Sequence, residues 1–142
     1  MRIEHSIDIA APVERVWELT LDVERWPEMT PTMTSVERLD HGPLAPGSEA
    51  RIEQPGQRTR VWRVVRVENG ADFAWSTRIG HLAVTGCHEL TAIEEGTRNT
   101  VAIEMEGFGA GLLGRLGRKR ALGLLSQENE GFKAAAEMSD VG

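Results

Sequence analysis

Four histidines and a single cysteine are the side chains of this 142-residue chain that most often carry chemistry in proteins. His88 stands out because it lies in a stretch of alternating apolar residues, which predicts that its imidazole points to the inner face of a strand. A buried imidazole can act as a general base or orient a ligand carbonyl. It can also be a core histidine that hydrogen-bonds the backbone or a neighbour. His88 is therefore the first candidate residue, with both interpretations open.

Arginines in the segment 57–67 provide a second candidate. One face of a strand here would carry Val61, Arg63, Val65 and Val67, and the other Arg60, Trp62, Val64 and Arg66. Whichever of the two faces points inward, at least one arginine lies among apolar residues. If Arg63 faces inward, its guanidinium could bind a ligand carboxylate or enolate. The alternatives are a structural ion pair or a side chain that extends to the surface.

The other ionisable side chains do not form a convincing set. Glu104 and Glu106 alternate with apolar residues and are predicted to be solvated, which argues against a paired-carboxylate hydrolase. His41 and His81 fall in predicted turns, and Cys87 falls on the strand face opposite the candidate imidazole. We therefore predict no metal site and no cofactor.

Composition limits the class of protein. With 22 acidic and 16 basic side chains, the chain has a net charge of −6 and should repel nucleic acid. Its apolar runs are far shorter than the roughly 20 residues of a membrane span, and the first residues lack the apolar core of a signal peptide. The single cysteine, Cys87, excludes an internal disulfide framework. These features predict a cytoplasmic protein.

The elements that must position these residues follow from hydrophobic periodicity and turn residues. Ile3, His5, Ile7 and Ile9 share one face of a first strand, and helical spacing then begins at Val13 and continues in two short pieces until Pro27 and Pro31. A long helix is predicted from Gly109 to Glu137. Between them we predict six antiparallel strands at Ser35–Leu39, Ser48–Gln54, Gln57–Val67, Asp72–Arg78, Leu82–Ala92 and Thr97–Glu106.

The segment 107–123 is rich in glycine, and each glycine inside a helix costs about 1 kcal/mol relative to alanine. Three interpretations stay open. The segment could be a mobile gate at a cavity, or its glycines could pack closely on the sheet. Contact with a membrane is also conceivable but is not the expected outcome. Leucines here adjoin basic residues, with Leu112, Leu113 and Leu116 beside Arg115, Arg118, Lys119 and Arg120.

The order of these motifs resembles the START-like superfamily, also called SRPBCC, and within it the polyketide cyclase/dehydrase branch. The matching positions are 7–17, Asp22 to Trp26, Gly47, Ala74-Trp75, His88 to Leu90, Gly96 to Arg98, and Phe132 to Glu137. The resemblance implies an α+β helix-grip fold, in which a curved seven-stranded antiparallel sheet surrounds a long C-terminal helix and two short helices follow the first strand. It also implies a single domain over residues 1–142, with 138–142 predicted to be a frayed tail.

The resemblance further implies a ligand cavity of several hundred Å³ between the sheet and the helices. In this fold the first and last strands pair, which would put His5 and His88 roughly 10 Å apart, too far to share a metal ion. The predicted cavity-lining residues are Trp26, Met29, Met33, Trp75, Val84, His88, Leu90, Ile103, Met105 and Leu116, each of which could instead be plain core.

Three functions are compatible with this reading. The first is binding of a small hydrophobic or aromatic ligand, with a cyclase or dehydratase activity in which His88 and Arg63 would assist enolisation or water loss. The second is a non-catalytic carrier or chaperone for a lipid, quinone or isoprenoid. The third is an interaction protein with a vestigial cavity. A monomer or a homodimer would suit each of them. A polar ionisable group deep in an apolar pocket would favour the first.

Overall fold

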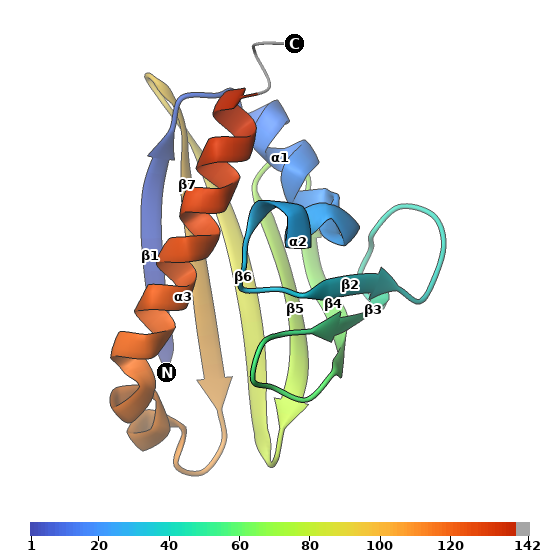
Figure 1. The fold of residues 1–142 in the computed structure, drawn as a ribbon, viewed down its shortest axis with the longest axis vertical. Coiled ribbons are helices and arrows are strands. Elements are labelled where there is room, and N and C mark those ends of the chain that lie inside the picture. The colour runs from blue at the N-terminus through green and yellow to red at the C-terminus, as the bar shows by residue number, and fades with distance from the viewer. Residues whose placement is uncertain (139–142) are drawn as a thin grey trace.

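Seven strands form one antiparallel sheet, and helix α3 (Ala110–Met138) lies across one face of it (Figure 1). The computed structural model describes residues 1–138. The strand order is β1-β7-β6-β5-β4-β3-β2, so the first and last strands pair as predicted. The bounds are β1 (Arg2–Ile9), β2 (Ser35–Arg38), β3 (Glu49–Glu53), β4 (Arg60–Glu68), β5 (Asp72–Ile79), β6 (Leu82–Ile93) and β7 (Gly96–Glu106).

The short helices follow β1 and cover the same face as α3 (Figure 1). They are α1 (Val13–Leu21), the 3₁₀ helix η1 (Val23–Arg25) and α2 (Trp26–Met29). Pro12 precedes the first turn of α1, where a missing N–H is tolerated. This arrangement confirms the predicted helix-grip architecture. Met138, the first residue of the predicted frayed tail, ends α3, and residues 139–142 lie outside the described part of the chain.

A β-bulge in β4 resolves the ambiguity over which face of that strand is buried. The pairing with β5 shifts between Val64 and Arg66, so Val65 has no opposite partner. Val64 therefore pairs with Trp75 on the inner face, while Arg66 pairs with Ala74 on the outer one. Because the bulge changes the alternation, neither Arg63 nor Arg66 has to lie in the core.

The predicted strand from Gln57 begins later than expected, at Arg60. Pro55 has no N–H, and Gly56 has a φ of 73°, so the chain turns here and the Gln57 N–H donates to the Gln54 carbonyl at 3.2 Å. Residues 54–59 therefore form a loop at the inner face instead of two extended strand ends.

The core lies between the sheet and the helices. Trp26, Phe73 and Phe132 are its largest fully buried side chains, and Trp26 meets the other two rings edge to face, at centroid distances of 6.2 Å and 5.5 Å. These rings come from α2, β5 and α3, so one aromatic cluster joins the short helices, the sheet and the long helix.

No helix within residues 1–138 is long and apolar enough to span a bilayer.

Candidate functional site

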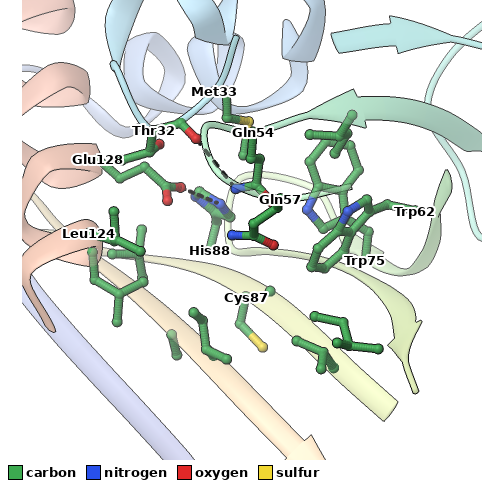
Figure 2. A pocket seen from close by; sticks show the side chains of 18 residues that line it. Thr32, Met33, Gln54, Gln57, Trp62, Trp75, Cys87, His88, Leu124 and Glu128 are labelled. Atoms are coloured by element: carbon green, nitrogen blue, oxygen red, sulfur yellow. Dashed lines mark hydrogen bonds and ion pairs between the residues drawn. The ribbon is translucent and has the colours of Figure 1, made fainter. Parts of the chain in front are cut away.

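A hollow of about 130 Å³ lies beside this aromatic cluster, between the sheet, the middle of α3 and two loops (Figure 2). Strands β4 to β7 form its floor, and the loops after α2 and β3 close one side. Its labelled lining residues in Figure 2 are Thr32, Met33, Gln54, Gln57, Trp62, Trp75, Cys87, His88, Leu124 and Glu128. Indole rings and aliphatic side chains thus surround a few polar groups, which is the usual character of a ligand site.

His88 points to the inner face of β6, as predicted, and is only 3% exposed. Its imidazole lies 4.7 Å from the ring of Trp26 and 5.6 Å from that of Phe132, centroid to centroid. Because burial among aromatic rings disfavours the imidazolium, the pKa of His88 falls from 6.5 to about 3. His88 is therefore neutral at physiological pH.

Glu128 of α3 is the ionisable partner that sequence reasoning missed. Its Oε1 lies 3.6 Å from His88 Nε2, and its side chain is only 12% exposed. Burial raises the pKa of this carboxyl from 4.5 to about 7, because the carboxylate loses contact with water. Figure 2 shows the two side chains directed toward one another across the hollow. A group with this pKa can both take up and release protons near neutral pH.

The hydrogen bonding of His88 favours one tautomer. Nδ1 is buried and has no hydrogen-bond partner within residues 1–138. An unpaired buried N–H is costly, so the hydrogen is favoured on Nε2, which faces Glu128. The separation of 3.6 Å is longer than a good hydrogen bond, so the pair has room to tighten.

A second polar contact fixes α3 next to this pair. Asn129 donates through Nδ2 to the His5 carbonyl at 2.9 Å, and its Oδ1 accepts from Asn99 Nδ2 at 2.8 Å. His5 pairs with Val101, which pairs with His88, so the two histidines lie two strands apart as predicted. The successive α3 residues Glu128 and Asn129 thus contact His88 and His5, respectively. Because Asn129 is buried and hydrogen-bonded to the sheet, it fixes the distance of Glu128 from the sheet.

Several predicted cavity residues do line the hollow, namely Met33, Trp75, Val84, His88 and Ile103. Other predicted cavity residues lie near the hollow without lining it. Trp26 and Leu90 are buried in the main core, Met29 lies at a separate groove against α3, and Met105 lines an adjoining hollow.

Two predicted site residues lie elsewhere. Leu116 is 74% exposed, because it points away from the sheet on α3. Arg63 is exposed on the outer face of β4 and does not line the hollow, so its proposed contact with a ligand has no structural support. Arg63 faces outward because its neighbours Trp62 and Val64 face inward, and the bulge after Val64 then lets Arg66 face outward as well.

Cys87 lies next to His88 in sequence but directs its sulfur to the other face of β6, as predicted (Figure 2). It packs there with Ala74 and Ala102, and Arg66 lies 3.9 Å from its Sγ. Burial raises the pKa of this thiol. Cys87 is therefore a core residue of the outer face and contributes no reactive thiolate to the hollow.

Two further hollows adjoin the central one. One of about 190 Å³ shares Thr32, Gln54, Gln57 and Leu124 with it and is also lined by Arg120. Another of about 220 Å³ shares Ile79, Val84 and Ile103 and extends under the first turns of α3. The central hollow, at about 130 Å³, is smaller than the predicted cavity. Together the three exceed the lower end, about 300 Å³, of the usual range for ligand sites.

Within residues 1–138 no group of three His, Cys, Asp or Glu side chains is arranged to hold a metal ion. The polar groups that line the hollow include one carboxyl group, one neutral imidazole and the amides of Gln54 and Gln57. Proton transfer and hydrogen bonding to a ligand oxygen are within the reach of such a set.

Comparison with known sequences identifies the family of this chain. The sequence profile of a family described as "Polyketide cyclase / dehydrase and lipid transport" matches residues 1–137. Over 94 residues the chain is 35% identical to a Streptomyces halstedii protein that carries the provisional name polyketide cyclase; the match covers 64% of this chain and 82% of that protein.

Solved structures show the same fold. A Thermus thermophilus protein superposes with a TM-score of 0.77 at 19% identity, over 98% of this chain and 99% of that one. The di-domain aromatase/cyclase StfQ of the steffimycin biosynthetic pathway superposes with a TM-score of 0.73 at 19% identity. That match covers 99% of this chain and 52% of StfQ. At these identities the likeness concerns the fold alone.

Proposed function

Because the chain belongs to the polyketide cyclase/dehydrase and lipid-transport family, we propose that its hollow binds a small aromatic or poly-β-keto ligand and that Glu128 and His88 transfer a proton on it. The observation that carries this proposal is the buried carboxyl–imidazole pair in a hollow otherwise lined mainly by aromatic and aliphatic side chains. A site that only held an apolar molecule would have no need for two desolvated ionisable groups, which cost stability.

The two pKa values assign the roles. With a pKa of about 3, the His88 imidazole is too weak a base to accept a proton at neutral pH. Glu128 has a pKa of about 7, which suits a general base at neutral pH. Glu128 is therefore the general base, in place of the role first considered for His88. His88 positions the carboxylate through Nε2–H.

The reaction that fits these roles is enolisation followed by ring closure. Glu128 takes a proton from a carbon beside a ketone, so the C–H bond breaks and the electron pair moves to form the enolate. The enolate carbon then attacks a second ketone of the same chain and forms a C–C bond, and the resulting alkoxide takes the proton back from Glu128 to become an alcohol. For water loss, Glu128 removes the second proton from the same α-carbon, a C=C bond forms as the C–O bond breaks, and Glu128 returns this proton to the departing hydroxide, which leaves as water. The amide of Gln57, which lies beside His88 in Figure 2, is placed to donate to the enolate oxygen.

The side chains around the pair provide the apolar surface for the ring. Trp62 and Trp75 lie 6.2 Å apart, centroid to centroid, and both rings approach Gly86, where an added Cβ would lie 3.5 Å from the Trp75 indole. The missing side chain at Gly86 leaves space between the indoles and the floor of the hollow. An aromatic ligand can contact both indoles there.

Hydrogen–deuterium exchange of a ketone tests the proposal without knowledge of the natural substrate. The probe is 2-tetralone, a bicyclic aryl ketone, in D₂O, with loss of its α-proton signals followed by NMR. The wild-type protein should accelerate exchange, with a rate that rises through pH 7 as Glu128 ionises. Glu128→Gln should lower the protein-dependent rate by about 10²- to 10⁴-fold, and His88→Phe should shift its pH profile.

Arg63→Ala provides the control, because this exposed arginine lies on the outer face of the sheet. It should leave the exchange rate unchanged. Quenching of Trp62 and Trp75 fluorescence by 2-naphthol measures binding separately. Acceleration no greater than that of buffer, together with tight binding, would reject the proton-transfer role and leave the carrier function.

That alternative, a non-catalytic carrier of a lipid, quinone or isoprenoid, has its own support. The hollow under the first turns of α3 is lined by aliphatic and other apolar residues, and it adjoins the central one. An elongated apolar ligand could occupy both. Native mass spectrometry of freshly purified protein would identify such a ligand directly.

A further inference from the structure

The first turns of α3 and the loop before them, residues 108–120, carry large apolar side chains that point to solvent. We call this segment the α3 tip. Phe108 is 93% exposed, and Leu116 and Leu112 are 74% and 61% exposed. Figure 1 shows the tip at the end of the molecule where the N-terminus lies, opposite the end where α3 finishes. Such a concentration of exposed apolar side chains at one place usually marks an interaction site.

Basic side chains surround these apolar ones. Leu112 and Leu116 are one helical turn apart and share a face, and Arg115 and Lys119 form the adjacent row. Arg118 and Arg120 extend the basic surface on either side of the helix. None of these four cations makes an ion pair with another residue of the described part of the chain.

The charge of the tip is opposite to that of the whole protein. No acidic residue occurs from 107 to 127, so this stretch has a net charge of +4, within a chain whose net charge is −6. We propose that the α3 tip docks on an anionic lipid surface, with its phenylalanine and leucines in the interface and its cations at the headgroups. Apolar side chains flanked by Lys and Arg are the pattern of helices that lie in a membrane interface.

A second copy of the chain fits this surface less well. In a twofold dimer through the tip, the same patch would face itself and bring four unpaired cations against four others. An acidic protein would satisfy the cations, but it would have to provide a groove for Phe108, which projects from a loop. A fluid lipid surface accepts isolated protruding side chains without a preformed groove.

Docking at this place would bring the hollows close to the bilayer. Leu113, Gly114 and Gly117 line the 220 Å³ hollow under the tip, and Arg120 lines the 190 Å³ one. The inference does not depend on the proposed proton transfer, since a carrier and an enzyme with an apolar substrate would both gain from access to lipid.

Vesicle flotation tests the proposal. The full-length protein is mixed with phosphatidylcholine vesicles and with vesicles of equal parts phosphatidylcholine and phosphatidylglycerol. We expect it to float with the anionic vesicles only, and less at high salt. Arg118→Gln/Arg120→Gln should weaken partitioning by about thirty-fold, at roughly 1 kcal/mol per cation near the surface. Leu112→Ser/Leu116→Ser should also release the protein from the vesicles.

Matched controls lie on β4 and in the loop before it. Arg58→Gln/Arg63→Gln removes two exposed arginines, and Val61→Ser/Val65→Ser removes two exposed apolar side chains. Neither pair should change flotation, and thermal unfolding of every variant establishes that it is folded. Absence of flotation with wild-type protein overturns the proposal. So does sedimentation as a dimer that Leu112→Ser/Leu116→Ser abolishes, because it would assign the tip to self-association.

Discussion

The two halves of α3 differ in what their side chains contact, although one continuous helix carries both. The C-terminal half, residues 124–136, which we call the α3 stem, buries Leu125, Asn129, Phe132 and Ala136. The α3 tip buries only its small residues Ala110 and Gly114. In the stem, side chains from the sheet and the short helices converge on the helix, whereas the outward face of the tip meets solvent.

This difference separates stability from surface function along a single helix. Helices owe most of their stability to packing of an apolar face. The stem has such a face and also holds Glu128 over the hollow, while the tip combines poor helix formers with exposed leucines. The stem should therefore control folding and proton transfer, and the tip should be free to change without loss of the fold.

The largest expected effect comes from truncating the same kind of side chain in both halves. Phe132 is fully buried, so Phe132→Ala should lower the free energy of unfolding by about 3–5 kcal/mol. Leu116 is 74% exposed, so Leu116→Ala should change it by less than about 0.5 kcal/mol. Urea denaturation of both variants measures the difference. Equal losses would mean that the tip is packed as firmly as the stem.

The next effect concerns the carboxyl that the stem buries. The pKa of Glu128 is raised from 4.5 to about 7, so between these pH values the folded protein binds a proton that the unfolded chain has lost. The carboxyl therefore costs stability as pH rises through this window. Glu128→Gln removes this cost, and from pH 4 to pH 8 the variant should gain about 3 kcal/mol relative to wild type.

His88 acts in the opposite sense, because its pKa is lowered to about 3 and the unfolded chain binds the extra proton between pH 3 and 6.5. His88 is present in both proteins, so the difference between their stability curves isolates Glu128. Glu130→Gln, which replaces an exposed glutamate of the same helix, serves as the control. A pH-independent difference between wild type and Glu128→Gln would show that the carboxyl is not desolvated.

The inward direction of His88 was predictable because a strand alternates with a period of two over its whole length. Glu128 was missed although the sequence contains a signal for it. Helical spacing puts Glu128 one turn from both Leu124 and Phe132, so it is a lone carboxylate within an apolar stripe. Only the packing of α3 on the sheet shows that it meets an imidazole.

Other features of the site depend on backbone irregularities that periodicity does not report. The bulge after Val64 lets Arg63 and Arg66 both face outward, and no residue type at that position signals a bulge. Gln57 reaches the hollow because the turn at Pro55-Gly56 is followed by a loop and not by a strand. The order of the helices and strands could be predicted because hydrophobic periodicity extends over many residues. The positions of single site residues could not, because they depend on a local bulge and a local turn.

A smaller effect is expected from adding one methyl group to the stem. A Cβ at Gly131 would collide with the backbone carbonyl of Met29 in α2, which cannot move as a flexible side chain could. Gly131→Ala should therefore lower the free energy of unfolding by about 1–3 kcal/mol, despite the better helix propensity of alanine. Thermal and urea unfolding measure this loss. A neutral result would show that α2 shifts easily and that the stem packs less tightly against it.

The smallest effect, opposite in sign, comes from the same substitution in the tip. A Cβ at Gly117 would have no atom within 4 Å outside its own stretch of helix, so close packing does not explain this glycine. Gly117→Ala should raise the free energy of unfolding by up to about 1 kcal/mol, because alanine favours the helix and meets no obstacle. In wild-type protein, amide exchange should be faster at 107–117 than at 124–136, and Gly117→Ala should slow it in the tip alone. If exchange were equally slow along all of α3, the tip would be as rigid as the stem and could not act as a gate.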